Sequence, residues 1–203
     1  VTAAAPIAVK LSDKEKKPSD ISSLSEIKSR FAPGSRKLVV FDRETGKLLW
    51  SRDAKFNFRH NNIALGGDSV FVIDSLTESR LKALGRRGLK LKGKPTLHAL
   101  DLKTGEVRWE TDENVFGTFL NYSAVHDLLL QAGSAFRDRA RDDVGQGMVA
   151  YQGSTGKELW ADKDLSYNGP CLLMKDRIIT NGNGGFALDI LTGKPTGWHY
   201  KRN

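Results

Sequence analysis

The chain has 203 residues, a net charge of +8 and 39% hydrophobic residues, which is ordinary for a globular protein. No apolar run approaches the roughly 18 to 20 residues of a membrane-spanning helix, which excludes a helical span. The single cysteine, Cys171, excludes an internal disulfide. The chain starts at Val1 without Met or a charged-then-apolar signal peptide, so we expect a processed end or an excised fragment.

Residues 1–36 are polar, charged and rich in Ser. They carry too little apolar surface to build a core. We interpret this segment as a linker or as an insertion between strands. The organised part of the chain then covers residues 37–203.

A strand–turn–strand pattern appears between Leu38 and Trp50. Apolar residues alternate up to Phe41, the Thr45-Gly46 pair breaks the run, and an extended pattern resumes toward Trp50. Glycine at the break suits the left-handed backbone position that ends a short hairpin loop. The pattern predicts a β-hairpin.

The same hairpin pattern recurs three more times, at residues 99–109, 150–160 and 187–198. All four tryptophans of the chain close one of the four copies, so the unit is a true repeat. The repeated positions are Trp50, Trp109, Trp160 and Trp198, and the turn glycines Gly46, Gly105, Gly156 and Gly193.

A second pair of apolar strands follows each of the first three tryptophans. The predicted pairs are 61–65 with 69–74, 122–125 with 128–132, and 171–174 with 177–180. Asp68, Asp127 and Asp176 hold the same position in the turns between them. An inner pair followed by an outer pair makes four antiparallel strands, which is one blade of a β-propeller.

Two insertions, at about residues 75–96 and 133–147, both join the second strand of a blade to the third. The first carries seven basic residues between Arg80 and Lys94 and no acidic one. This basic loop is either a solvated insertion or a surface for an anionic partner. Nucleic acid is not expected, because no aromatic residues interleave the charges.

The repeat resembles the tryptophan-docking motif of PQQ-like (pyrroloquinoline-quinone-type) β-propeller repeats, over about Leu38 to Tyr200. The resemblance implies that each tryptophan packs against the neighbouring blade. It predicts an all-β fold, a partial propeller of about three to four four-stranded antiparallel blades. Because family propellers close with about seven or eight blades, we expect a fragment of a larger ring. A small four-bladed ring is the alternative.

Ligands of propellers usually bind near the innermost strands, which line the central channel. Polar residues begin all three predicted inner strands, and they could bind a polar ligand or Ca²⁺ through oxygen atoms. The alternative is that they satisfy backbone groups at turns. The candidates are His60, Asn61, Asn62, Asn121, Tyr122, Ser123 and Asn168. No histidine or cysteine spacing indicates a metal site.

Two functions remain open. The first is a non-catalytic interaction or assembly scaffold, as in family members that act in outer-membrane protein assembly. The second is part of a quinoprotein-like dehydrogenase that binds PQQ and Ca²⁺ in the channel and oxidises an alcohol or a sugar. No catalytic residue can be assigned from the motifs. The resemblance also implies a periplasmic or otherwise extracytoplasmic location, and remaining blades or a protein partner at the open ends.

Overall fold

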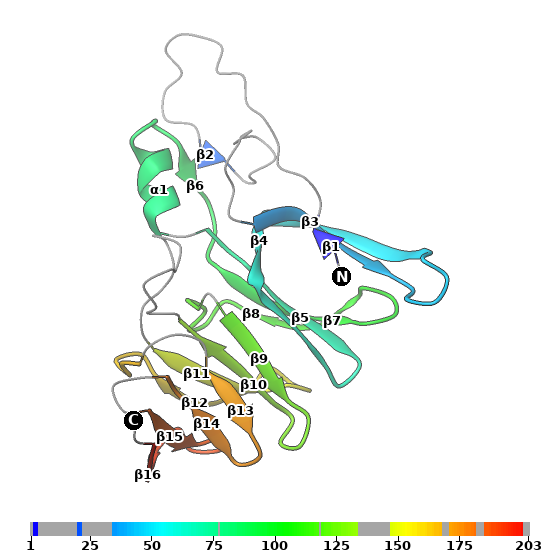
Figure 1. Cartoon of the computed structure of the whole chain (residues 1–203). Coiled ribbons are helices and arrows are strands. Elements are labelled where there is room, and N and C mark those ends of the chain that lie inside the picture. The colour runs from blue at the N-terminus through cyan, green and yellow to red at the C-terminus, as the bar shows by residue number, and fades with distance from the viewer. Residues whose placement is uncertain are drawn as a thin grey trace.

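The computed structural model of the chain describes residues 2–3, 20–21, 34–76, 78–117, 119–133, 147–167, 171–181 and 185–200 (Figure 1). The described residues form a stack of twisted antiparallel sheets. The predicted all-β fold is confirmed, with one short helix, α1 (Glu78–Gly85), among the described residues.

Three complete four-stranded blades, numbered second to fourth, follow a partial first blade along the chain. The second blade contains the end of β4 (Leu48–Gly66), β5 (Ser69–Asp74), β7 (Thr96–Asp101) and β8 (Val107–Thr111). The third contains β9 (Phe119–Ser123), β10 (Leu128–Ala132), β11 (Met148–Gln152) and β12 (Glu158–Asp162). The fourth contains β13 (Leu172–Met174), β14 (Arg177–Ile179), β15 (Phe186–Asp189) and β16 (Pro195–His199).

The long strand β4 belongs to two blades. Its residues 48–59 pair with β3 (Gly34–Phe41) in the outer hairpin of the first blade, and residues 63–66 pair with β5 of the second. The register shifts between Phe58 and Ile63, where the strand crosses from one blade to the next. This crossing merges the first two blades into one hydrogen-bonded sheet.

The first blade also contains a piece of the N-terminal segment. Strand β1 (Thr2–Ala3) pairs antiparallel with β3, in the place that the second strand occupies in the other blades. The segment between β1 and β3 therefore has the same topological position as the two predicted insertions. Within it, β2 (Asp20–Ile21) pairs in parallel with β6 (Lys90–Leu91) of the basic loop. Figure 1 shows β2, β6 and α1 together, away from the stacked blades.

Apolar side chains fill each seam between neighbouring blades. One cluster joins the first blade to the second and includes Leu38 and Val70. Another joins the second to the third around Phe71 and Leu129, and a last cluster joins the third to the fourth around Leu130. Strands β5 and β10 are buried on both faces because each lies between two blades. In β14 only Ile178 is buried.

The inner turns differ in detail from the predicted ones. Strand β9 ends at Ser123, and Val125 lies in the turn with 81% of its surface exposed, so the predicted strand over 122–125 was displaced. Asp68 and Asp127 adopt the left-handed backbone conformation, whereas in the fourth blade Lys175 does so. The predicted loop over 75–96 contains α1 and β6. Within the described residues, no helix has the length and apolarity to cross a bilayer.

The buried thiol of Cys171 lies in the seam between the third and fourth blades. Burial raises its pKa to about 12, so the thiol stays protonated near neutral pH. We expect iodoacetamide at pH 8 to leave Cys171 unmodified in the folded protein and to alkylate it in urea, as read by mass spectrometry. Equal rates in both states would contradict the packing of this seam.

Candidate functional site

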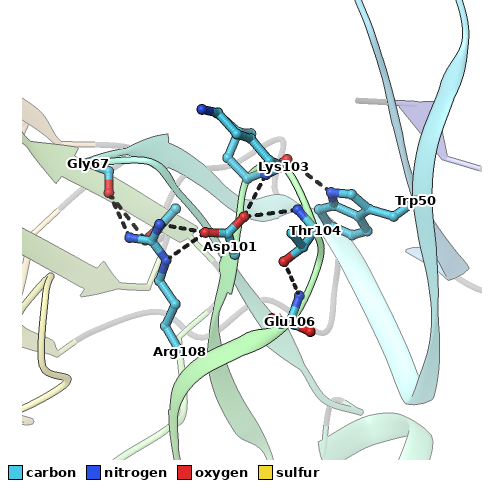
Figure 2. Close-up of polar contacts among 9 residues, drawn as sticks. Trp50, Gly67, Asp101, Lys103, Thr104, Glu106 and Arg108 are labelled. Carbon is cyan, nitrogen blue, oxygen red and sulfur yellow. Dashed lines mark hydrogen bonds and ion pairs between the residues drawn. The ribbon is translucent and has the colours of Figure 1, made fainter.

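Each outer hairpin is closed by a turn that its own side chains stabilise. In the second blade the Asp101 carboxylate accepts hydrogen bonds from the N–H groups of Lys103 and Thr104, both 2.9 Å (Figure 2). Thr104 Oγ1 in turn accepts the N–H of Glu106 at 3.3 Å. Gly105 completes the turn with φ of +75°, a conformation that side chains with a β-carbon rarely adopt. Asp42 and Asp189 organise equivalent turns.

Three of the four indoles lie on the turn glycine of the following blade. A β-carbon added to Gly105 would lie 2.6 Å from the ring of Trp50, and one added to Gly156 would lie 2.5 Å from the ring of Trp109. Gly193 meets Trp160 in the same way, at 2.6 Å. These glycines therefore serve two needs at once, a positive φ and room for an indole.

The same indoles also donate a hydrogen bond to the following blade. In each case the acceptor is the backbone carbonyl of the residue that follows Asp101, Gln152 or Asp189 in the turn. The Nε1–H of Trp50 donates to Leu102 at 2.9 Å, that of Trp109 to Gly153 at 2.7 Å, and that of Trp160 to Ile190 at 2.9 Å. Sequence reasoning missed these acceptors because a backbone carbonyl leaves no mark on residue type.

Each acceptor residue is itself anchored to the inner turn of its blade. The N–H groups of Leu102, Gly153 and Ile190 donate to the carbonyls of Asp68, Asp127 and Asp176. Asp68, Asp127 and Asp176 therefore accept the same hydrogen bond in their blades, although Asp176 does not share the left-handed backbone conformation of the other two. A chain of contacts thus runs from the indole of one blade through the outer turn to the inner turn of the next.

The two ends of the stack lack this arrangement. No described atom lies within 4 Å of a β-carbon built on Gly46, so its turn faces open space. At the other end, the indole N–H of Trp198 makes no hydrogen bond among the described residues, and its ring lies 5.8 Å from that of Tyr200. Among the described residues, the Gly46 turn therefore carries no indole and the Trp198 indole lies on no turn glycine.

The end faces also expose apolar side chains that are buried in the middle of the stack. Phe41 is 44% exposed, whereas Leu100 and Tyr151, at the same place in the next two blades, are buried. On the fourth blade, Leu172 and Met174 are 67% and 57% exposed. No other described sheet covers these two faces as the internal ones are covered.

Among the described residues, only Asp101 of the turn aspartates is paired with an arginine, Arg108. Arg108 donates to its carboxylate from Nη2 at 2.6 Å and from Nε at 3.2 Å, and its Nη1 reaches the carbonyl of Gly67 (Figure 2). The Arg108 hydrogen bonds, with those from the N–H groups of Thr104 and Lys103, hold the pKa of Asp101 well below its usual range. The ionised carboxylate thereby joins the outer turn to the inner one.

Replacing Arg108 by Gln is expected to raise the pKa of Asp101 toward its ordinary value, because the charged donor is lost. A depressed pKa in the folded state adds stability above the pKa of the unfolded chain, and this stability is lost as pH falls through the folded value. In Arg108→Gln this contribution to stability should therefore be smaller, and its loss should be complete at a higher pH. Carboxyl ¹³C NMR titration measures the pKa of Asp101 in both proteins. Asp42, whose pKa is lowered by hydrogen bonds from Thr45, is the internal control and should not change.

Two of the inner-strand candidates, Asn62 and Ser123, are buried. The Nδ2 of Asn62 lies 3.4 Å from the Gly117 carbonyl, and its Oδ1 has no hydrogen-bond partner among the described residues. His60 and Asn61 lie in β4 where that strand changes blades. Ser123 is buried, and Asn121 Oδ1 accepts the N–H of Tyr122.

Tyr122 contributes to the seam between the second and third blades. Its ring stacks on Phe71 at 5.2 Å and lies against Gly66. Its hydroxyl donates to Asp127 at 2.9 Å. Burial, with the neighbouring Asp127 carboxylate, raises its pKa to about 12. Asn168, the remaining candidate, lies outside the described residues.

The described candidates Asn62, Asn121, Tyr122 and Ser123 do not form a calcium ligand set by themselves. Ca²⁺ takes about six to eight oxygen ligands, among which carboxylates are prominent. The described candidates contain no carboxylate, Asn62 is closed off from solvent, and Tyr122 is engaged with Asp127. Across the residues that the structure describes, no three His, Cys, Asp or Glu side chains gather as metal ligands would.

Buried polar side chains fix the segments that connect one blade to the next. Gln131 accepts the N–H groups of Phe116 and Gly117 and donates to the carbonyl of Asn114 and the hydroxyl of Tyr151. One blade earlier, the Asp74 carboxylate accepts three successive backbone N–H groups, those of residues 55–57. The inner-strand prediction overlooked Gln131 and Asp74 because both occur inside apolar strands.

A cavity of about 340 Å³ opens at the foot of the basic loop. The cavity is lined by residues that include Lys94, Asp112, Phe116 and Lys163. Lys94 Nζ forms an ion pair with Asp112 Oδ2 at 3.4 Å. None of the predicted inner-strand residues lines it. Nearby on the loop, Arg86, Arg87 and other basic residues are exposed.

The sequence profile of the family described as "Outer membrane protein assembly factor BamB" matches residues 34–196. A comparison with curated protein sequences gives no match. Among solved structures, BamB from Moraxella catarrhalis is similar over 84% of this chain and 44% of its own length, with a TM-score of 0.56 and 15% identity.

Two further solved structures are similar to part of this chain. The computationally designed Ika8 protein matches over 83% of this chain and 46% of its own, with a TM-score of 0.52 and 16% identity. A europium-containing methanol dehydrogenase matches over 78% and 37%, with a TM-score of 0.49 and 19% identity. The chain spans less than half the length of each of these three proteins. The expectation of a partial β-propeller is confirmed.

Proposed function

Because the chain belongs to the family described as outer membrane protein assembly factor BamB, whose members contain PQQ-like β-propeller repeats, we propose that it is a non-catalytic interaction and assembly module. Its working surfaces are the two open ends of the blade stack. The tryptophans and turn glycines dock one blade on the next inside the module. We place the module outside the cytoplasm, as the family's role at the outer membrane implies.

This proposal is supported mainly by the indole–glycine contact of the seams, of which each end of the stack presents only one half. Every internal seam combines an indole, a turn glycine and a carbonyl acceptor. The Gly46 turn and the Trp198 indole each present one half of that contact, beside exposed Phe41, Leu172 and Met174. Exposed apolar side chains next to a specific docking group are typical of a protein interface. Further blades, in the same or another polypeptide, are its natural partners.

The proposal is tested by site-specific photo-crosslinking in the cells that make the protein. A photoreactive residue at position 172 or 41 should capture a protein segment that carries a Thr-Gly turn followed by a tryptophan. The control is position 125, which is more exposed than either but lies in an inner turn away from both end faces. Equal capture at all three positions would contradict the assignment of the end faces as interfaces.

The dehydrogenase alternative predicts that PQQ and Ca²⁺ stay bound, whereas the non-catalytic module predicts that they do not. Added PQQ and Ca²⁺ should pass through gel filtration without being retained, because the described inner-strand side chains do not offer a calcium ligand set. Retained quinone absorbance together with alcohol-dependent dye reduction would overturn the non-catalytic assignment.

A further inference from the structure

Most of the net positive charge of the chain lies in the basic loop. Of the 32 Lys and Arg residues, seven lie between residues 80 and 94 with no acidic residue among them, and the remaining 25 nearly balance the 24 Asp and Glu residues. The rest of the chain is therefore close to neutral. We propose that the basic loop binds an anionic lipid surface through the phosphates of the headgroups.

Hydrogen bonds at the end of α1 hold the first of these charges in a folded turn. The N–H groups of residues 88 and 89 donate to the carbonyls of residues 85 and 84 respectively, both at 3.0 Å, and Gly88 has φ of +72°. This pair of bonds around a left-handed glycine is the Schellman motif, which closes a helix and fixes the direction of the chain that follows. Arg86 and Arg87 lie within this turn and are exposed.

The other basic side chains of the described loop are exposed as well, namely those of Lys82, Lys90, Lys92 and Lys94. Lys94 is paired with Asp112, whereas Arg86, Arg87 and Lys90 form no ion pair among the described residues. The acidic residues of this part of the fold are Glu78, which begins α1, and Asp20, which is the register partner of Lys90 in β2. The excess of positive charge is therefore large even when both are counted.

An exposed leucine lies among the basic side chains. Leu81 is 42% exposed on α1, whereas Leu84, on the same helix, is buried. Lys82 and Arg86 are four residues apart and lie on the same side of the helix, next to Leu81. Basic side chains around an exposed leucine are typical of helices that bind anionic membranes. In such helices the leucine enters the headgroup region while the cations stay at the phosphates.

The composition of the loop disfavours other anionic partners. Protein interfaces are enriched in aromatic residues and depleted of lysine, but residues 78–94 contain four lysines and no Phe, Tyr or Trp. The lack of aromatic residues also disfavours single-stranded nucleic acid. A single small anion needs converging cations, and the cavity of about 340 Å³ at the foot of the loop is lined by only one of the seven basic residues, Lys94. Charges spread over a protrusion fit an extended anionic surface.

The place of the loop in the fold leaves it accessible to such a surface. Figure 1 shows α1 and β6 away from the stacked blades. The loop joins the second strand of its blade to the third, and the third strand then runs back to the outer turn, so the outer turns lie at the opposite ends of the strands. None of the loop residues lies at the open end faces. Lipid binding is therefore independent of the proposed interaction module and adds a second surface to it.

The test measures binding of the purified whole protein to vesicles by flotation in a density gradient. Vesicles of phosphatidylcholine and phosphatidylglycerol in equal parts are compared with vesicles of phosphatidylcholine alone. A variant with Arg86→Gln, Arg87→Gln and Lys90→Gln should bind the anionic vesicles at least about tenfold more weakly, because each cation near the surface adds to the attraction. Added salt should weaken binding of the unchanged protein as well, because it screens the same attraction.

The matched control removes the same charge from the opposite ends of the strands. It carries Lys47→Gln, Lys157→Gln and Lys194→Gln, each at the exposed residue that follows a turn glycine. This variant should keep the binding of the unchanged protein within about twofold. Circular dichroism checks that both triple variants are folded. An equal loss in the two variants, or no preference of the unchanged protein for anionic vesicles, would overturn the proposal.

A fluorescent label at position 81 shows whether the loop itself reaches the lipid. Because Cys171 is buried, Leu81→Cys supplies an accessible thiol for a dye whose emission depends on its surroundings. The emission should shift to the blue on anionic vesicles, while the same dye at Val125→Cys, in an inner turn, should not shift. The absence of a shift at position 81 would refute contact with lipid.

Two soluble competitors separate the lipid surface from other anions. Inorganic phosphate, at the phosphate concentration of the vesicles, should not displace the protein; if it does, the loop binds a single anion and the proposal is wrong. Polyglutamate should bind more weakly than the vesicles at equal concentration of anionic groups. Tighter binding of polyglutamate would assign the loop to an acidic protein instead.

Discussion

Replacing Gly156 by alanine is expected to lower the free energy of unfolding by about 2 to 4 kcal/mol. The residue has φ of +75°, which costs an alanine about 1 kcal/mol or more. Its new β-carbon would also lie 2.5 Å from the indole of Trp109, and overpacking of this kind costs about 1 to 3 kcal/mol. Urea denaturation followed by circular dichroism measures the change.

Gly88 separates the two contributions. It has a similar φ of +72°, and nothing lies within 4 Å of a β-carbon built on it. Gly88→Ala should therefore show only the backbone cost, about 1 kcal/mol. If both variants lose the same amount of stability, the indole contact at Gly156 contributes nothing and the seam does not depend on it.

A second large loss of stability is expected when Gln131 is replaced by Leu. The side chain is fully buried and holds four partners: the N–H groups of Phe116 and Gly117 at 2.8 and 2.7 Å, the carbonyl of Asn114 at 2.9 Å, and the Tyr151 hydroxyl at 3.1 Å. Leucine has nearly the same size but leaves two N–H groups without an acceptor in the protein interior. At about 1 to 3 kcal/mol for each, the loss should reach about 3 to 5 kcal/mol.

Gln152 provides the control for this substitution. It is a glutamine of the same blade, but it is only half-buried and its Oε1 accepts a single hydrogen bond, from the Thr155 hydroxyl. Gln152→Leu should cost less than about 1 kcal/mol. A loss in Gln131→Leu no larger than that in Gln152→Leu would show that the connecting segment does not depend on the buried amide.

The local turn chemistry is readable without coordinates because its determinants lie within a few residues. An Asp or Gln, a Thr and a Gly at fixed spacing are enough to build the turn, and the structure contains the corresponding hydrogen bonds in each copy. The strand alternation on either side is likewise set by the period of two. The insertions at about residues 75–96 and 133–147 leave this turn and strand pattern intact, because they lie between the second and third strands of a blade and outside the outer hairpins.

The inner-strand candidates show where sequence reasoning stops. For Asn62 and Tyr122 the sequence left a ligand-binding role and a structural role open, and the structure encloses the first and packs the second on Phe71. Polarity alone does not say which face of a strand looks at a channel and which looks at a neighbouring blade. The crossing of β4 between two blades decides this, and it depends on pairing with strands before and after it.

By itself the sequence determined the repeat, its hairpins and the all-β class, because these follow from the local spacing of turn and apolar residues. Only the tertiary structure decided which carbonyl each indole reaches, that β1 joins the first blade, and that no described indole lies on the Gly46 turn. The reason is physical: a seam is made by two sheets that are far apart in sequence, and its energy depends on their relative placement, which no local pattern encodes.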